Sequence, residues 1–171
     1  KVKPFYNSED LKAIGLSGKP KNQGWSTAQG IYAGNAKLAN KKALDAITRG
    51  AECICFTVPS SEINIHQLLN EIDLGQTIIH FDLQFLSVQY VQSLLTVTEN
   101  HLQKVFTNID IVGHLARNGN WHYNLDQDHK ILGEILNLNH EQTLGVDMAL
   151  YANAGADLVQ QLAYALAHPN E

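Results

Sequence analysis

Short apolar runs alternate with amphipathic stretches along most of this chain. Strand-like apolar runs are predicted at residues 25–32, 51–58, 77–81, 105–112 and 144–148. Apolar residues at helical spacing, which mark one buried face per helix, are predicted at 36–49, 63–72, 86–101 and 128–138, and again after Asp157. This alternation predicts βαβ units, a parallel sheet and right-handed crossovers.

The last unit carries the clearest local signals. Small residues fill positions 153–156, which indicates a tight turn or a nearby ligand. Asp157 can cap the next helix, Gln160 stands where a capping-box partner would, and Pro169 stops the helix. Five apolar residues at helical spacing predict its buried face: Leu158, Val159, Leu162, Ala163 and Leu166.

The fold class follows from the repeated units. About five such units fit either a doubly wound sheet or part of a (β/α)8 barrel. The first strand is not followed by GxGxxG or GxxxxGK[ST], which argues against dinucleotide and P-loop folds and favours the barrel. We therefore expect an α/β fold of the TIM-barrel type, a partial barrel of about five βα units at 25–171 after an extended segment at 1–24.

The composition and charge of the chain argue against some classes of binding partner. With 44% hydrophobic and 17% charged residues, the chain has the balance of an ordinary globular protein. A net charge of −5 without a basic run argues against nucleic acid and anionic membranes as main partners. Neither a transmembrane-length apolar stretch nor a secretory signal is present, so we expect a cytoplasmic location. Since the chain starts at Lys1 and stops where a helix finishes, we expect a piece of a longer protein.

Two cysteines, Cys53 and Cys55, lie two positions apart in the second predicted strand. Their side chains should point to the same face without bridging easily. Buried, reduced thiols are expected, because a metal site would need further ligands that the sequence does not locate. Residues 53–56 (CICF) also predict bulk on both faces of this strand, and therefore a filled barrel interior.

Polar residues follow the predicted strands, where a parallel barrel carries its chemistry. His80 and Asp82 face the same way, and Asp110 with His114 could join them in the manner of a metal-dependent barrel hydrolase. However, HxH and HExxH spacings are absent, and such residues are more often caps or hydrogen-bond partners, so we expect no metal site. The hydrolase remains an alternative that would need four side chains to converge: His80, Asp82, Asp110 and Asp147.

Three segments carry a resemblance to a known family. They are VKPFYNSEDL (2–11), WSTAQGIYAGNAKLANKKALDAITRGAE (25–52) and ANAGADLVQQLAYALAHPNE (152–171). Together they resemble the N-terminal barrel domain of the methylmalonyl-CoA mutase family, in particular its small, β-type subunit. The run AGA-x-x-x-QxLAYxLA is the most specific part. The resemblance implies a (β/α)8 barrel followed by a cobalamin-binding flavodoxin-like domain, which is absent from this chain.

In the working subunit of that family, coenzyme A threads the barrel axis and adenosylcobalamin covers the barrel mouth. A radical rearrangement then converts methylmalonyl-CoA to succinyl-CoA, with the radical supplied by the cofactor.

This sequence departs from the catalytic pattern of the family. The family motif TMYxxRPWTIRQYAG carries a tyrosine over the reacting centre, but here KNQG (21–24) precedes Trp25, and Ala28 replaces the arginine before Gln29. The catalytic histidine of the GYHMQEAGA-type loop falls at Leu150, which can neither donate a hydrogen bond to a thioester carbonyl nor shuttle a proton. The DxHxxG cobalt-ligand motif is also missing.

The resemblance and the departures together predict a non-catalytic small-subunit barrel that pairs with the large (alpha) subunit as a heterodimer. Adenosylcobalamin would belong to the intact enzyme and not to this chain. Catalytic residues are not expected, and the candidates for the barrel mouth are Gln29, Tyr32, Asn35 and Asp110. A catalytically active mutase-like acyl-CoA isomerase is the main alternative, and an open, polar barrel axis would favour it.

A partial barrel has two open sheet edges, and open edges invite pairing with other strands. We therefore expect the isolated chain to self-associate, or to cover an edge with residues 1–24.

Overall fold

The computed structural model describes residues 25–138 and 140–167, and it contains a parallel four-stranded sheet. The expectations for the segment at 1–24 and for Pro169 lie outside these residues. The strands follow one another in the order β1-β2-β3-β4, and the order never reverses. A doubly wound sheet reverses its order at a switch point. The predicted α/β fold with a parallel sheet is therefore confirmed. The strands are β1 (Ala28–Tyr32), β2 (Cys53–Val58), β3 (Ile78–Leu83) and β4 (Val105–Phe106).

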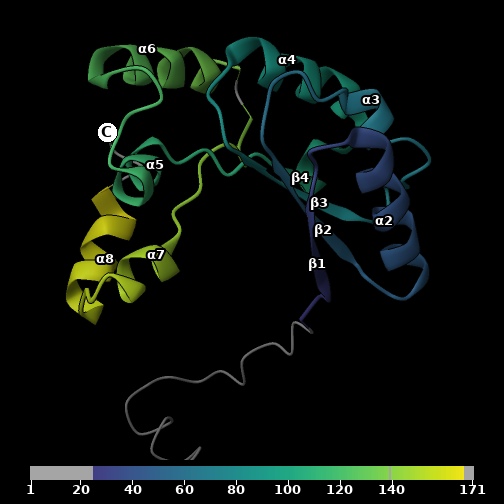
Figure 1. The fold of residues 1–171 in the computed structure, drawn as a ribbon, viewed down its shortest axis with the longest axis horizontal. Coiled ribbons are helices and arrows are strands. Elements are labelled where there is room, and N and C mark those ends of the chain that lie inside the picture. The colour runs from purple at the N-terminus through teal and green to yellow at the C-terminus, as the bar shows by residue number, and fades with distance from the viewer. Residues whose placement is uncertain (1–24, 139, 168–171) are drawn as a thin grey trace, which may run out of the picture.

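A helix follows each strand, and four of the helices pack side by side. α2 contacts α3, α3 contacts α4, and α4 contacts α6, so these four form a curved layer along the sheet (Figure 1). The other three α-helices, α5, α7 and α8, gather on the left of the same view. The helices are α2 (Ala36–Thr48), α3 (Ile65–Leu68), α4 (Val88–Val97), the 3-10 helix η1 (Glu99–Lys104), α5 (Ile111–Asn118), α6 (Leu125–Leu136), α7 (Met148–Asn153) and α8 (Leu158–Ala167). None of the helices in these ranges is both long and apolar enough to cross a membrane.

Side-chain caps explain where most of these helices begin. A short polar side chain accepts a free backbone N–H of the first turn, which the helix itself cannot satisfy. The capping box predicted before α8 is confirmed: Gln160 N–H donates to Asp157 Oδ1 at 2.8 Å, and Asp157 N–H donates to Gln160 Oε1 at 2.9 Å. The other capping residues are Asn35, Asn64, Ser87, Asp110, Asn124 and Asp147.

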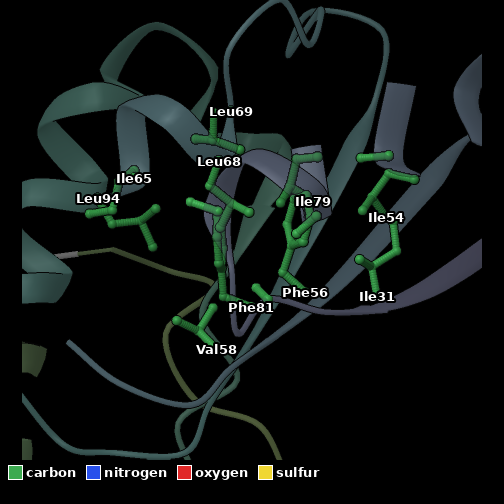
Figure 2. Packing of buried hydrophobic residues seen from close by; sticks show 14 of the residues in the cluster. Ile31, Ile54, Phe56, Val58, Ile65, Leu68, Leu69, Ile79, Phe81 and Leu94 are labelled. Carbon is green, nitrogen blue, oxygen red and sulfur yellow. The ribbon is translucent and has the colours of Figure 1, made fainter. Parts of the chain in front are cut away.

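The core lies between the sheet and the helices. Alternate residues of β2 and β3 point into it and are fully buried, and the rings of Phe56 and Phe81 lie 5.9 Å apart. Leu68 of α3 and Leu94 of α4 cover these strands from the helical side (Figure 2). Fully burying each such side chain stabilises the fold by about 1.5–3 kcal/mol.

Apart from Tyr32 at the end of β1, the opposite face of β1 and β2 carries small side chains. Cys53 and Cys55 share that face as predicted, with their sulfur atoms 4.0 Å apart, and both are free thiols. Burial raises the pKa of the Cys53 thiol to about 12, so it stays protonated. The expectation of bulk on both faces of this strand is wrong, because the large side chains of Ile54, Phe56 and Val58 all lie on the helical side.

Two predicted strands are shorter than expected. The strand predicted at 105–112 ends at Phe106, because Asp110 caps α5 and turns Ile111 and the residues after it into a helix. In the run predicted at 144–148, only Leu144 forms a bridge, parallel to Ile109, and α7 begins at Met148. The helix predicted at 63–72 shrinks to α3, and the one at 86–101 divides into α4 and η1.

Residues 142–145 nevertheless extend the sheet as a short fifth segment. The N–H groups of Thr107 and Ile109 donate to the carbonyls of Gln142 and Thr143 at 3.0 and 2.8 Å, and Gly145 N–H donates back to the Ile109 carbonyl. The fifth neighbour therefore lies beside β4, again in chain order.

The buried face predicted for α8 is wrong for the part of the chain that the structure describes. Leu158, Val159 and Leu162 are 82%, 77% and 59% exposed, and Ala163 and Leu166 are exposed as well. Their helical spacing is real, but their side chains remain largely exposed in the described structure. Periodicity identifies an apolar face and cannot say what covers it.

Candidate functional site

A cavity of about 360 Å³ opens at the carboxyl ends of β3 and β4, beside the segment that leads into α7. This volume lies at the lower end of the range for small-molecule sites. We call it the strand-end cavity. Its polar lining comes from five separate segments: His80, Asp82, Gln84, Asn108, Asp110, His114, Arg117, His122 and Asp147.

His80 is held in one orientation by two neighbours. Asn108 Nδ2 donates to His80 Nδ1 at 3.1 Å, and the ring of Phe106 stacks on the imidazole with centroids 4.4 Å apart. Because Nδ1 accepts, the proton of the neutral ring sits on Nε2. Burial lowers the pKa of His80. The side chain is therefore a neutral hydrogen-bond donor at neutral pH.

Asn108 adopts an unusual backbone conformation directly after β4. Its φ is +43°, in the left-handed region that costs a non-glycine residue roughly 1 kcal/mol or more. Gly145 lies against it, since a Cβ at Gly145 would sit 2.9 Å from Asn108 Cα. Glycine at 145 thus permits the close approach that fixes Asn108 against His80. Strain of this kind persists where the surroundings enforce it, often at functional sites.

Two further histidines stack on one another in the lining. The rings of His114, on α5, and His122, before α6, have centroids 3.6 Å apart. Burial is the main cause that lowers the pKa of each, and His114 lowers that of His122 further. Both imidazoles are therefore neutral at neutral pH.

Asp128 fixes the turn that carries His122. This aspartate is fully buried, and its two carboxylate oxygens accept the backbone N–H groups of His122 at 2.8 Å and Tyr123 at 3.0 Å. A buried carboxylate is stable only with such partners. The turn that ends at His122 and Tyr123 is thus attached to α6.

Two of the three acidic residues in the cavity serve mainly the protein backbone, and the third, Asp82, accepts a hydrogen bond from Gln84 Nε2 at 2.9 Å. Asp110 Oδ1 accepts Gly113 N–H at 2.7 Å and caps α5. Asp147 caps α7 and also forms an ion pair with Arg117 at 3.2 Å. That pair is nearly half exposed and contributes at most about 1 kcal/mol. The groups best placed to bind a ligand are therefore the neutral imidazoles and amides, which suit ligand oxygens.

The four candidates for the barrel mouth are not brought together. Asp110 lines the strand-end cavity. Gln29 and Tyr32 line a different cavity, of about 460 Å³, between β1 and α2. Asn35 caps α2 by accepting Leu38 N–H at 2.9 Å. Gln29 is the second residue of β1 and therefore does not lie at its carboxyl end.

The candidates for the hydrolase do share the strand-end cavity, but they do not form a metal site. In the described ranges, no three histidine, cysteine, aspartate or glutamate side chains are arranged to hold a metal ion. Asp110 and Asp147 turn their carboxylates toward helix N-termini instead. The convergence that the hydrolase alternative requires is absent from this part of the chain.

Arg117 and His122 were missed by the sequence analysis. A signal for Arg117 existed: Asp110, His114 and Arg117 recur at helical spacing and share one face of the helix that starts after the fourth strand. His122 had no comparable signal, because its place depends on the contact of its turn with Asp128.

Comparison with protein-family models and with curated proteins found no match to this chain.

Proposed function

We propose that this chain is the N-terminal barrel portion of the small subunit of a methylmalonyl-CoA mutase-type isomerase, and that it supports a catalytic large subunit without turning over substrate itself. The proposal includes a partial (β/α)8 barrel and a cytoplasmic location. The observation that carries it is the one-directional strand order with α2, α3, α4 and α6 packed side by side. Such an order supports a barrel, because in a closed (β/α)8 barrel each strand pairs with its sequence neighbours.

The residue at position 150 supports a non-catalytic role for this chain. The resemblance puts the catalytic histidine of the family at Leu150, whose side chain has no polar atom to hydrogen-bond a thioester or transfer a proton. Leu150 lies on α7, partly buried, and does not line the strand-end cavity. The chemistry of that cavity comes from other side chains.

Adenosylcobalamin fits the intact enzyme of the proposal but not the described residues. The sequence has no DxHxxG motif, and the strand-end cavity is far smaller than a corrin ring with its nucleotide tail. His140 Nε2 bonds the Val105 carbonyl at 2.8 Å in a buried position, and Asn108 occupies His80 Nδ1. We therefore assign no step through the cofactor to this chain.

The test is co-expression with a candidate large subunit. The complex would be purified through a tag on this chain, and succinyl-CoA formation would be assayed with adenosylcobalamin. The proposal expects the large subunit to co-purify and activity to require both chains. Turnover by this chain alone, or full activity of the large subunit without it, would refute the proposal.

A second candidate is a catalytically active acyl-CoA isomerase. The face of the sheet away from the helices favours it, because Ala28, Gly30, Cys53 and Cys55 give the β1 and β2 part of that face small side chains beside His80 of β3. His80 could then donate from Nε2 to a thioester carbonyl. Calorimetric titration with succinyl-CoA would test this: binding that His80→Phe abolishes supports the candidate, and no binding by the wild-type chain removes it.

A further inference from the structure

We propose that Cys53 and Cys55 together bind a soft cation, Cu(I), on the face of the sheet away from the helices. Both residues lie in β2, and their sulfur atoms are 4.0 Å apart. β2 pairs with β1 on one side and with β3 on the other, so the site does not depend on an open sheet edge. It is also independent of the function proposed above, because a closed barrel would keep the same face of β2 in its interior.

The two sulfur atoms converge. Residues two positions apart in a strand are separated by about 6.6 Å along the backbone. Because the Sγ atoms of Cys53 and Cys55 are only 4.0 Å apart, the two side chains lean toward one another, and they share a weak S–H···S hydrogen bond. A disulfide bond measures about 2.05 Å, and both residues are free thiols. The pair is therefore a dithiol with the spacing of two ligands of one ion.

This spacing fits a metal ion between the two sulfur atoms. With a metal–sulfur bond of about 2.3 Å, as in zinc thiolates, sulfur atoms 4.0 Å apart give an S–metal–S angle of about 120°. Binding is a ligand exchange in which each thiol gives its proton to solvent and forms a metal–sulfur bond. No electron is transferred, so the step needs no oxidant or reductant.

The number of protein ligands favours Cu(I) over Zn(II). Thiolates select soft cations, and both ions bind them. Zinc sites in proteins use three or four protein ligands. Within residues 25–138 and 140–167, no three histidine, cysteine, aspartate or glutamate side chains are arranged to hold a metal ion. Cu(I) forms stable complexes with two thiolates alone, so the dithiol of β2 suffices for it.

The neighbouring strand leaves room for the ion. Gly30 of β1 is the register partner of Cys55, and Ala28 is the partner of Cys53. Partners in adjacent strands project to the same face of a sheet. A Cβ at Gly30 would meet no atom of the described residues within 4 Å. The dithiol therefore borders open space on the side of Gly30, and the half-buried Cys55 gives access to it.

Oxidation chemistry fits this pair less well than metal binding. Burial raises the pKa of the Cys53 thiol to about 12, so its sulfur is not a thiolate at neutral pH. Redox-sensing cysteines are exposed and have low pKa values. A soft cation, by contrast, displaces the thiol protons as it binds.

The test is competition for Cu(I) between the full 171-residue chain and a coloured Cu(I) chelator, without oxygen and with ascorbate as reductant. The sequence contains two cysteines, so we expect one Cu(I) per chain. Removing a residue that merely supports a metal ligand costs 10–100-fold in affinity. Loss of a ligand itself, in Cys53→Ala or Cys55→Ser, should therefore weaken binding by about 100-fold or more. X-ray absorption at the copper edge should show sulfur as the coordinating atom.

Two further variants locate the ion. Gly30→Val keeps both thiols but fills the space beside Cys55, and it should weaken binding by about tenfold or more because the added side chain crowds the ion. His66→Ala removes an exposed imidazole on α3, away from the dithiol, and should leave the affinity unchanged. Circular dichroism must show that each variant folds. If Cys53→Ala does not fold, Cys55→Ser and Gly30→Val carry the test.

Four results would overturn the proposal. The first is an affinity of the wild-type chain for Cu(I) no higher than that of dithiothreitol, which would mean adventitious thiol binding only. The second is an affinity that Cys55→Ser leaves unchanged, and the third is one that Gly30→Val leaves unchanged. The fourth is tighter binding of Zn(II) than of Cu(I), which would contradict a site made of two thiolates alone.

Discussion

Asp128 is the residue whose replacement gives the most direct test of how the strand-end cavity is built. Its carboxylate is fully buried and accepts two backbone N–H groups, from His122 and Tyr123. A hydrogen bond to a charged group contributes about 1.5–3 kcal/mol. Asp128→Ala removes both bonds, but the freed amides lie near the surface and can reach water. We therefore expect the free energy of unfolding to fall by about 3 kcal/mol, the lower end of the sum.

Asp126 provides the matched control, because it is exposed and lies in the first turn of the same helix. Asp126→Ala loses the favourable interaction of a carboxylate with the helix N-terminus, at most about 1 kcal/mol, but no buried bond. Asp128→Asn keeps one acceptor oxygen, so its loss in the free energy of unfolding should lie between the losses of Asp128→Ala and Asp126→Ala.

Urea unfolding and thermal melting would measure these differences. The loss for Asp128→Ala corresponds to a fall in Tm of about 6–12 °C in a chain of this size. The NMR signals of the His114 and His122 rings should shift in the same variant, because the turn that stacks them is released. Equal stability of Asp128→Ala and Asp126→Ala would refute the account of the turn.

Three further predictions follow from the same contacts. The pKa values of His114 and His122 lie below the ordinary 6.5, so the unfolded chain binds more protons than the folded chain on acidification. Tm should therefore fall from pH 7 to pH 5, and it should fall less in the variant that carries both His114→Asn and His122→Asn. An equal fall in that variant would exclude these histidines as the cause. Gly145→Ala should cost about 1–3 kcal/mol in urea unfolding because its Cβ would collide with Asn108, and unchanged stability would show that the two segments can separate freely. Leu162→Asp should change stability by no more than about 0.5 kcal/mol, and a large loss would mean that this face of α8 is covered.

Features that depend on residues close together in the chain could be predicted well from the sequence. The capping box of Asp157 and Gln160 was identified correctly because it depends on residues three positions apart. The same-face placement of Cys53 and Cys55 followed from the two-residue period of a strand. The strand at 105–112 was overextended because Ile111 and Val112 look β-like, while the cap at Asp110 decides in favour of a helix.

The candidate site was predicted only in part, because its members come from distant segments. Their positions after the predicted strands identified four candidates that do line one cavity: His80, Asp82, Asp110 and Asp147. Their spacing could not show that two of the carboxylates are turned toward helix N-termini, where they cap backbone N–H groups.

By itself, the sequence determined the alternation of strands and helices, the apolar face of each helix and the capping box before α8, because these depend on neighbours within a few positions along the chain. Only the tertiary structure decided which apolar faces are covered, as the buried Phe56 and the exposed Leu158 show. It also decided that His114 and His122 stack and that Gly145 presses on Asn108. The physical reason is that burial, close approach and shifts in pKa depend on contacts between segments far apart in sequence, and local periodicity carries no information about them.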